Sequence, residues 1–395
     1  MTGLLGDWAN LLLRWTHFIA GIAWIGSSFY FIWLDRALNA PSAPRAGVEG
    51  EVWMVHSGGF YQTEKRRPGP GEMPAVLHWF KWEALFTWIT GIALLVLVYY
   101  LSDGYLLDPA VSNIGRGTAT ALGIALLVVG WLLYDLLWRS PLGADDRAWM
   151  ASVISLVFLA AVTIASCRLL SGRGAYMHVG ALLGTLMVAN VWMRILPAQQ
   201  AMIDATKAGR QPDFTMGERA KRRSVHNSYM TFPLLFIMLS NHYPRTYASP
   251  ANWLVLLLLF VAGAAVRHAM IGRGSSARWA LVPAAVALFG AVFFSTPKAA
   301  AGGEGGGAVP AFTEVRAVID RRCLPCHSRF PSDRTFGAAP AGVAFDTPES
   351  IVALAARIRV RAVETQTMPL GNKTGITPDE RALLARWLAA GAPLR

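Results

Sequence analysis

The sequence predicts an all-α protein in two parts, a bundle of eight transmembrane helices and a small helical domain after it. Of its 395 residues, 54% are hydrophobic and only 15% are charged, whereas a soluble domain has about 25% charged residues. Eight apolar segments reach roughly 20 residues, which is long enough to cross a bilayer. A motif with two cysteines and a histidine, Cys323-Leu324-Pro325-Cys326-His327, follows the last of these segments.

The predicted spans divide the chain into three regions. Residues 1–297 form the membrane domain, 298–310 a glycine-rich segment with the composition of a flexible linker, and 311–395 the C-terminal domain. Two of the three cysteines belong to the motif, and the third, Cys167, is expected to be a small buried hydrophobic residue. We place the eight spans at 9–34, 78–101, 117–138, 148–169, 174–195, 224–242, 250–271 and 277–296.

The basic residues predict the orientation of the bundle. They concentrate in the first and fifth connections between spans, while the second and sixth carry one each, Arg116 and Arg245. Because cytoplasmic loops are enriched in Lys and Arg, the odd-numbered connections are expected in the cytoplasm. Both termini and the C-terminal domain are then periplasmic, at a bacterial inner membrane. This placement accounts for the net charge of +12, so we expect the lipid bilayer and no nucleic acid as a partner.

The spacing Cys-x-x-Cys-His is the attachment signal for a c-type haem. The thiols of Cys323 and Cys326 bind the porphyrin, and His327 is one axial ligand. Met368 is the only methionine after the last span, and thioether ligation suits a haem that accepts electrons. The alternatives are a zinc site or a chance match for the motif, and a surface methionine for Met368.

The elements expected around this motif have the order of a class I cytochrome c. An amphipathic helix at 312–322 leads into it. Thr347 with Pro348 predicts the start of a second helix, and Thr377 with Glu380 forms a capping box for the last one. We therefore expect one covalent haem c in a small cytochrome domain.

Six histidines lie in or at the ends of the predicted spans, where ligand-grade residues are candidates for function. Sorted by depth, they form one group toward each membrane face, as bis-histidine b haems require. One or two b-type haems are therefore expected, with interfacial or helix-bonding histidines as the alternative. The periplasmic group is His17, His178 and His242, and the cytoplasmic group is His78, His226 and His268.

A further candidate site is the first cytoplasmic connection, where residues 55–65 combine a glycine turn with His56, Tyr61 and Lys65. A solvated loop is the alternative interpretation. A likeness to a known family is carried by the segments 24–31, 34–36, 56–61 with Lys65, 77–83, 190–192, 226–227 and 240–244. On these segments the whole chain resembles bacterial membrane-bound urate oxidases (urate hydroxylases), whose eight-span domain is fused to a cytochrome c. One departure is Ser57, where the family pattern has the first of three glycines.

This resemblance implies that urate is oxidised to 5-hydroxyisourate and that two electrons leave through the cytochrome to the respiratory chain. Hydrogen peroxide is then not a necessary product. His56, Tyr61 and Lys65 would act as the base and the orienting groups. The expected partners are urate or another small substrate and a respiratory electron acceptor, either a cytochrome c or a terminal oxidase. The competing interpretations are a quinol or alcohol dehydrogenase and an electron-transfer subunit that feeds a terminal oxidase.

Overall fold

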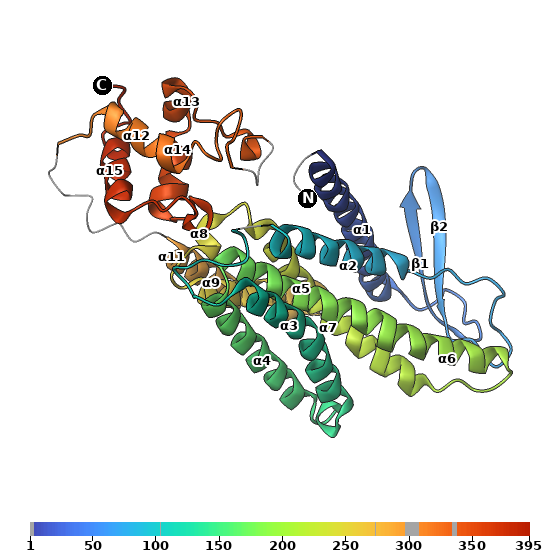
Figure 1. Cartoon of the computed structure of the whole chain (residues 1–395). Coiled ribbons are helices and arrows are strands. Elements are labelled where there is room, and N and C mark those ends of the chain that lie inside the picture. The colour runs from blue at the N-terminus through green and yellow to red at the C-terminus, as the bar shows by residue number, and fades with distance from the viewer. Residues whose placement is uncertain (1–3, 103, 273, 297–307, 334–337) are drawn as a thin grey trace.

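A computed structural model describes residues 4–102, 104–272, 274–296, 308–333 and 338–395. Most of the predicted linker, residues 298–307, lies outside the described residues. Helices dominate the structure, as predicted, and they form a long bundle with a smaller helical domain at one end (Figure 1). The bundle helices are α1 (Leu4–Ala37), α2 (Trp82–Leu95), α3 (Arg116–Arg139), α4 (Ala148–Leu169), α5 (Gly172–Asn190), α6 (Leu196–Lys207), α7 (Phe214–Ser240), α8 (Pro244–Tyr247), α9 (Asn252–Ile271), α10 (Ser275–Arg278) and α11 (Leu281–Ser295).

Within the described residues, seven helical segments are long and apolar enough to cross a membrane. The remaining predicted span, 224–242, overlaps α7, which ends two residues before it. This helix starts ten residues earlier than expected, and its charged first part lowers its hydropathy. It packs against both α5 and α9. Two helices continue through π-helical turns, Val96–Tyr100 after α2 and Val191–Ile195 between α5 and α6.

The connections lie at two opposite ends of the bundle. Segments before α3, between α4 and α5 and after α7 line one cavity together with the C-terminal domain. The first and fifth connections meet at the opposite end, where the amide of Gly71 donates to the carbonyl of Thr206 at 2.8 Å. We call these the C-terminal end and the hairpin end.

α5 is the centre of the bundle. Half of the apolar window in its segment is buried, against 17–28% in the other candidate spans. Tyr176, His178, Val179 and Leu182 are fully buried, and the Tyr176 hydroxyl donates to the carbonyl of Asn252 at 2.7 Å. The other helices therefore pack around α5, and α1, α4 and α11 carry many exposed apolar side chains, as expected of helices that face lipid.

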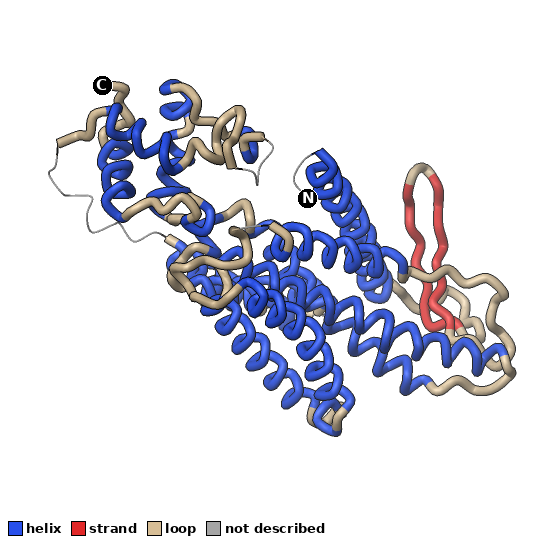
Figure 2. The backbone as a smooth tube through the Cα atoms, in the orientation of Figure 1, coloured by secondary structure: helices blue, strands red, loops and turns tan. Residues whose placement is uncertain are grey.

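The expectation of an all-α fold is wrong for the first connection, which forms a β-hairpin (Figure 2). Strands β1 (Val48–His56) and β2 (Gly59–Arg66) are antiparallel. The residues of the turn, Ser57 and Gly58, both have positive φ angles, of 50° and 76°, as a type I′ turn requires. β-Branched and aromatic residues in both strands favour this structure.

The C-terminal domain has its own core. Ile319, Ile351, Leu384 and Trp387 are fully buried there, and Cys323 packs against them. Thr347 and Thr377 both accept hydrogen bonds from the third residue of the helix that follows, as predicted. Its helices are α12 (Phe312–Arg322), α13 (Pro348–Ala353), α14 (Ala355–Ile358) and α15 (Pro378–Ala389), with a π-helical turn at Arg359–Glu364.

Candidate functional site

The cysteine–histidine motif follows α12 directly and forms a tight turn. The amide of His327 donates to the carbonyl of Cys323 at 2.9 Å, and the amide of Phe345 donates to the carbonyl of His327 at 2.8 Å. Nδ1 of His327 lies 2.9 Å from the carbonyl oxygen of Val343. This contact orients the imidazole and directs Nε2 toward a second partner, as in metal-binding histidines.

The segment that carries Met368 is also held by specific contacts. Its amide donates to the carbonyl of Arg361 at 2.9 Å. Its carbonyl accepts a hydrogen bond of 2.9 Å from Nη1 of Arg381 on α15, which also donates to the carbonyl of Ala362. Thr365 and Thr367 bond to each other through their hydroxyls at 3.1 Å. Met368 therefore belongs to a fixed loop anchored on the last helix.

This donor set has the chemistry that a covalently attached haem needs. Burial raises the pKa of the Cys323 thiol to about 12 and lowers the pKa of His327, which favours a neutral imidazole. Cys323 and Cys326 are not joined in a disulfide. In the described part of the chain, no group of three or more His, Cys, Asp or Glu residues is arranged to hold a metal ion.

Four of the bundle histidines, His17, His178, His226 and His268, have tyrosine, threonine or carbonyl partners. Nδ1 of His17 lies 2.9 Å from the carbonyl oxygen of Thr87. In His226 and His268, Nδ1 lies 2.7 Å and 2.6 Å from the hydroxyls of Tyr134 and Tyr229. Each of these three rings therefore engages Nδ1 and keeps Nε2 for another partner.

His178 differs because both of its nitrogens are engaged. Nδ1 lies 2.7 Å from the carbonyl of Gly174, and Nε2 lies 3.0 Å from the hydroxyl of Tyr100. These contacts are those of a satisfied core histidine. Among the described residues, no ring contact or hydrogen bond joins two of the six histidines, so the structure does not bring His17, His178 and His242, or His78, His226 and His268, into contact as pairs.

The three residues predicted in the first connection lie on the hairpin, and only two of them are neighbours. His56 pairs with Gly59 beside the turn, and the ring of Tyr61 lies against Gly59. Lys65 is four residues further along β2, about 13 Å away along the strand, and forms an ion pair of 2.8 Å with Asp35. His56 and Tyr61 are both exposed. Neither residue lines the cavity beside the C-terminal domain or a smaller cavity at the hairpin end.

A second cavity, of about 370 Å³, lies at the hairpin end. It is lined by His78, Trp79, Arg67 and Phe214 among others. The guanidinium of Arg67 lies 4.7 Å from the centre of the Phe214 ring and forms an ion pair of 2.9 Å with Glu49. The only arginine in this lining is therefore already neutralised.

A buried charge cluster in the bundle was not predicted. Asp135 of α3 is only 5% exposed. Arg223 of α7 approaches it at 3.0 Å, and Nε of Arg194 donates to it at 2.7 Å from the π-helical turn after α5. Beside it, Asn190 donates to Tyr134 at 3.2 Å and to Asn227 at 2.9 Å. The signal that could have identified this cluster is an aspartate inside a predicted span.

Comparison with known proteins identifies one family. No curated protein and no solved structure gave a significant match. Residues 3–296 match the family described as urate oxidase N-terminal. This match covers the bundle and the hairpin and most of the chain, so the protein belongs to the urate oxidase N-terminal family.

Proposed function

We propose that this protein is a membrane-bound oxidoreductase that oxidises urate to 5-hydroxyisourate and passes the electrons through a haem c in its C-terminal domain. Membership of a urate oxidase family supports the substrate. The observation that carries the electron route is the donor set after residue 296: two thiols, an imidazole with Nδ1 on Val343 and a methionine on a fixed loop.

Each residue of that set has a defined task. The thiols of Cys323 and Cys326 would attach the haem, and His327 and Met368 would hold its iron. A haem bound there accepts one electron at a time. Val343 holds the imidazole in orientation, and Arg381 holds the backbone of Met368, so both ligands are fixed by contacts outside the metal.

The reaction has a simple balance. One urate monoanion and one water give 5-hydroxyisourate, one proton and two electrons. The water oxygen forms a bond to C5 of the purine, and the electrons leave in two successive transfers to a respiratory acceptor, a cytochrome c or a terminal oxidase. Dioxygen is not consumed at the site, and hydrogen peroxide is not a necessary product.

We place the protein in a bacterial inner membrane, with both termini and the C-terminal domain in the periplasm. The concentration of Lys and Arg in the first and fifth connections supports this orientation. These connections meet at the hairpin end, away from the C-terminal domain. His56 and Tyr61 of the hairpin stay candidates for the base, whereas Lys65 is engaged with Asp35.

A relay of one or two b haems in the bundle is a separate proposal. The orientation of His17, His226 and His268, with Nδ1 engaged, supports them as ligands, and His178 fits this role least. The Cys323→Ala/Cys326→Ala variant decides the matter. Its reduced-minus-oxidised spectrum retains b-type bands if the relay exists and is featureless if these histidines are structural.

The test of the function uses the purified full-length protein. Urate should lose its ultraviolet absorbance while the haem becomes reduced, and the Cys323→Ala/Cys326→Ala variant should lose covalently bound haem and this reduction. An electron-transfer subunit would leave urate unchanged and respond only to a redox partner. A quinol or alcohol dehydrogenase would be reduced by those compounds and not by urate. Either result contradicts the proposal.

A further inference from the structure

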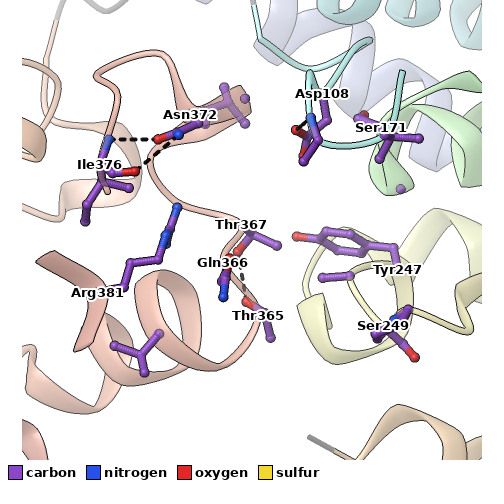
Figure 3. A pocket seen from close by; sticks show the side chains of 18 of the residues that line it. Asp108, Ser171, Tyr247, Ser249, Thr365, Gln366, Thr367, Asn372, Ile376 and Arg381 are labelled. Atoms are coloured by element: carbon purple, nitrogen blue, oxygen red, sulfur yellow. Dashed lines mark hydrogen bonds between the residues drawn. The ribbon is translucent and has the colours of Figure 1, made fainter. Parts of the chain in front are cut away.

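A large cavity separates the bundle from the C-terminal domain. It has a volume of about 1130 Å³. Figure 3 shows one wall formed by Asp108, Ser171 and Tyr247 of the bundle, which faces Thr365, Thr367 and Arg381 of the C-terminal domain. Neither part of the protein builds this cavity alone.

Specific contacts hold the two walls together. Arg245 forms an ion pair of 2.8 Å with Glu364, and Nη1 of Arg361 donates to the Tyr247 hydroxyl at 2.9 Å. Leu370 covers Gly104, where a Cβ would lie 3.1 Å from the leucine side chain. The cavity is therefore a feature of the docked arrangement.

The lining is strongly cationic. It contains four arginines, Arg168, Arg173, Arg381 and Arg386, and a single carboxylate, Asp108. Among the described residues, no carboxylate forms an ion pair with Arg168, Arg173 or Arg386. The N-terminal turn of α5, with its positive dipole end, contributes Gly172 and Arg173 to the same wall. This wall is built to attract an anion.

Arg173 is held in place by aromatic side chains. Its Nη2 donates to the Tyr247 hydroxyl at 3.0 Å, and its guanidinium lies 5.2 Å and 5.4 Å from the ring centres of Tyr105 and Tyr247. A planar guanidinium binds paired oxygen or nitrogen acceptors in two parallel hydrogen bonds, and aromatic rings favour a flat partner. A planar heterocyclic anion matches both features.

The cavity also adjoins the segment that carries the proposed haem ligand. Thr367, which precedes Met368, lines the cavity, and Arg381 connects the lining to the Met368 carbonyl through a hydrogen bond of 2.9 Å. An electron donor bound here is on the same side of the bundle as the haem. Electron transfer from it does not have to cross a hydrocarbon core about 30 Å thick.

From these observations we infer that the interdomain cavity is the binding site for the purine anion, with Arg173 and Arg168 as anion-binding residues. The inference rests on the proposed function and specifies where it takes place. Each bound monoanion gains oxygen from water and releases two electrons, one after the other, which a haem held by Cys323, Cys326, His327 and Met368 would pass to the respiratory acceptor. At this site the carboxylate of Asp108, in place of His56 or Tyr61, accepts the proton that is released.

The first test compares arginine variants of the holoprotein. Arg173→Gln and Arg168→Gln should each raise the KM for urate by about 10-fold or more, because each loses a charge-assisted hydrogen bond. Arg173→Lys should retain part of the affinity. Haem reduction by ascorbate and the haem spectrum should not change. Arg147→Gln, an exposed arginine at the hairpin end, is the matched control and should behave as the wild type.

The second test measures binding without turnover. Protein reduced by dithionite cannot take electrons from urate, so equilibrium dialysis then gives the Kd directly. Arg173→Gln should weaken this binding by the same factor as the KM. In closed right-side-out vesicles, added urate should reduce the haem without crossing the membrane.

The outcomes separate the two proposals. Binding of urate to the reduced wild type, together with no oxidation of urate by the oxidised wild type, refutes the function and supports the site. Oxidation of urate with unchanged KM and Kd in both Arg173→Gln and Arg168→Gln overturns the site and leaves the function. Loss of urate binding in His56→Ala, or reduction only from the opposite face of the vesicle, also overturns it. Since Arg168 is exposed, its variant keeps the test valid if Arg173→Gln fails to fold.

Discussion

The two ends of the bundle differ in how their positive charges are neutralised. At the hairpin end, basic residues are numerous, and several of them have acidic partners. At the C-terminal end they are fewer, yet Arg168 and Arg173 line a cavity in which the only carboxylate is that of Asp108. The pairs at the hairpin end are Arg45 with Glu51 and Glu64, Lys65 with Asp35, Arg67 with Glu49, Arg194 and Arg223 with Asp135, and Arg222 with Asp145.

Membrane orientation and anion binding depend on positive charge in different ways. The number of Lys and Arg in a loop bears on membrane orientation, because acidic neighbours contribute little to that rule. Anion binding depends on the charge that remains after pairing. The positive charge without an acidic partner is larger in the interdomain cavity than in the smaller cavity at the hairpin end, where Arg67 is paired with Glu49.

The largest expected effect is at the buried charge cluster of the hairpin end, formed by Asp135, Arg194 and Arg223. Asp135→Asn should lower the free energy of unfolding by about 3–5 kcal/mol, because Arg194 and Arg223 lose their common buried counter-charge. Arg173→Gln at the other end removes a charge without an acidic partner and should cost far less. Thermal unfolding in detergent measures both.

The control for this prediction is Asp146→Asn, which breaks an exposed pair with Arg147. Exposed pairs contribute about 0–1 kcal/mol. If Asp135→Asn were no more destabilising than this control, the charges at the hairpin end would not be held by their partners, and the comparison between the two ends would fail.

A second prediction concerns the closest approach at the C-terminal end. A Cβ on Gly172 would lie 2.0 Å from the carbonyl oxygen of Tyr247, so Gly172→Ala should push α8 away from α5. The expected loss of stability is about 1–3 kcal/mol, as for other overpacked sites, together with a higher KM for urate.

Gly184→Ala in the same helix is the matched control. Nothing lies within 4 Å of a Cβ at Gly184, and alanine favours a helix by up to about 1 kcal/mol relative to glycine. Its stability should therefore stay level or rise, and its KM should not change. A KM that is unchanged in both variants would mean that the wall near Tyr247 does not contribute to binding.

The sequence predicted the features that depend on local patterns. Span 148–169 coincides with α4, helix 312–322 with α12, and the caps at Thr347 and Thr377 are confirmed. The motif at Cys323 was visible because attachment of a haem requires a fixed short spacing. Such signals involve neighbouring residues, so the sequence contains them directly.

Other features depend on residues that are far apart in the chain. The hairpin could have been predicted from alternating β-branched and aromatic residues around Ser57 and Gly58, but its exposure could not. Asp135 meets arginines 59 and 88 residues later. The interdomain cavity needs Asp108, Arg173 and Arg381 together. No local pattern encodes contacts of this kind.

A third prediction concerns the docking of the two domains. Glu364→Gln breaks the ion pair with Arg245. The side chain of Arg245 is 52% exposed and that of Glu364 is 24% exposed. The expected loss of stability is about 0.2–1 kcal/mol. Because salt screens such pairs, the KM of the variant should depend less on ionic strength than the KM of the wild type. Exchanging the charges, with Arg245→Glu and Glu364→Arg together, should restore the original dependence. A KM unaffected by Glu364→Gln at every salt concentration would show that this pair does not hold the cavity closed.

The smallest expected effect is at the tip of the hairpin, and it tests which end of the molecule binds substrate. Ser57 has a φ of 50°, a conformation that costs a residue with a side chain roughly 1 kcal/mol. Ser57→Gly should therefore stabilise the hairpin by up to about 1 kcal/mol and slow hydrogen exchange at the paired residues Val55 and Phe60. Gly58→Ala should have the opposite effect, since Gly58 has a φ of 76°. Neither variant should alter the KM for urate if the anion binds between the domains. No residue of the hairpin lines the interdomain cavity. A change in KM that follows the stability of the turn would therefore place His56 and Tyr61 in the binding site instead.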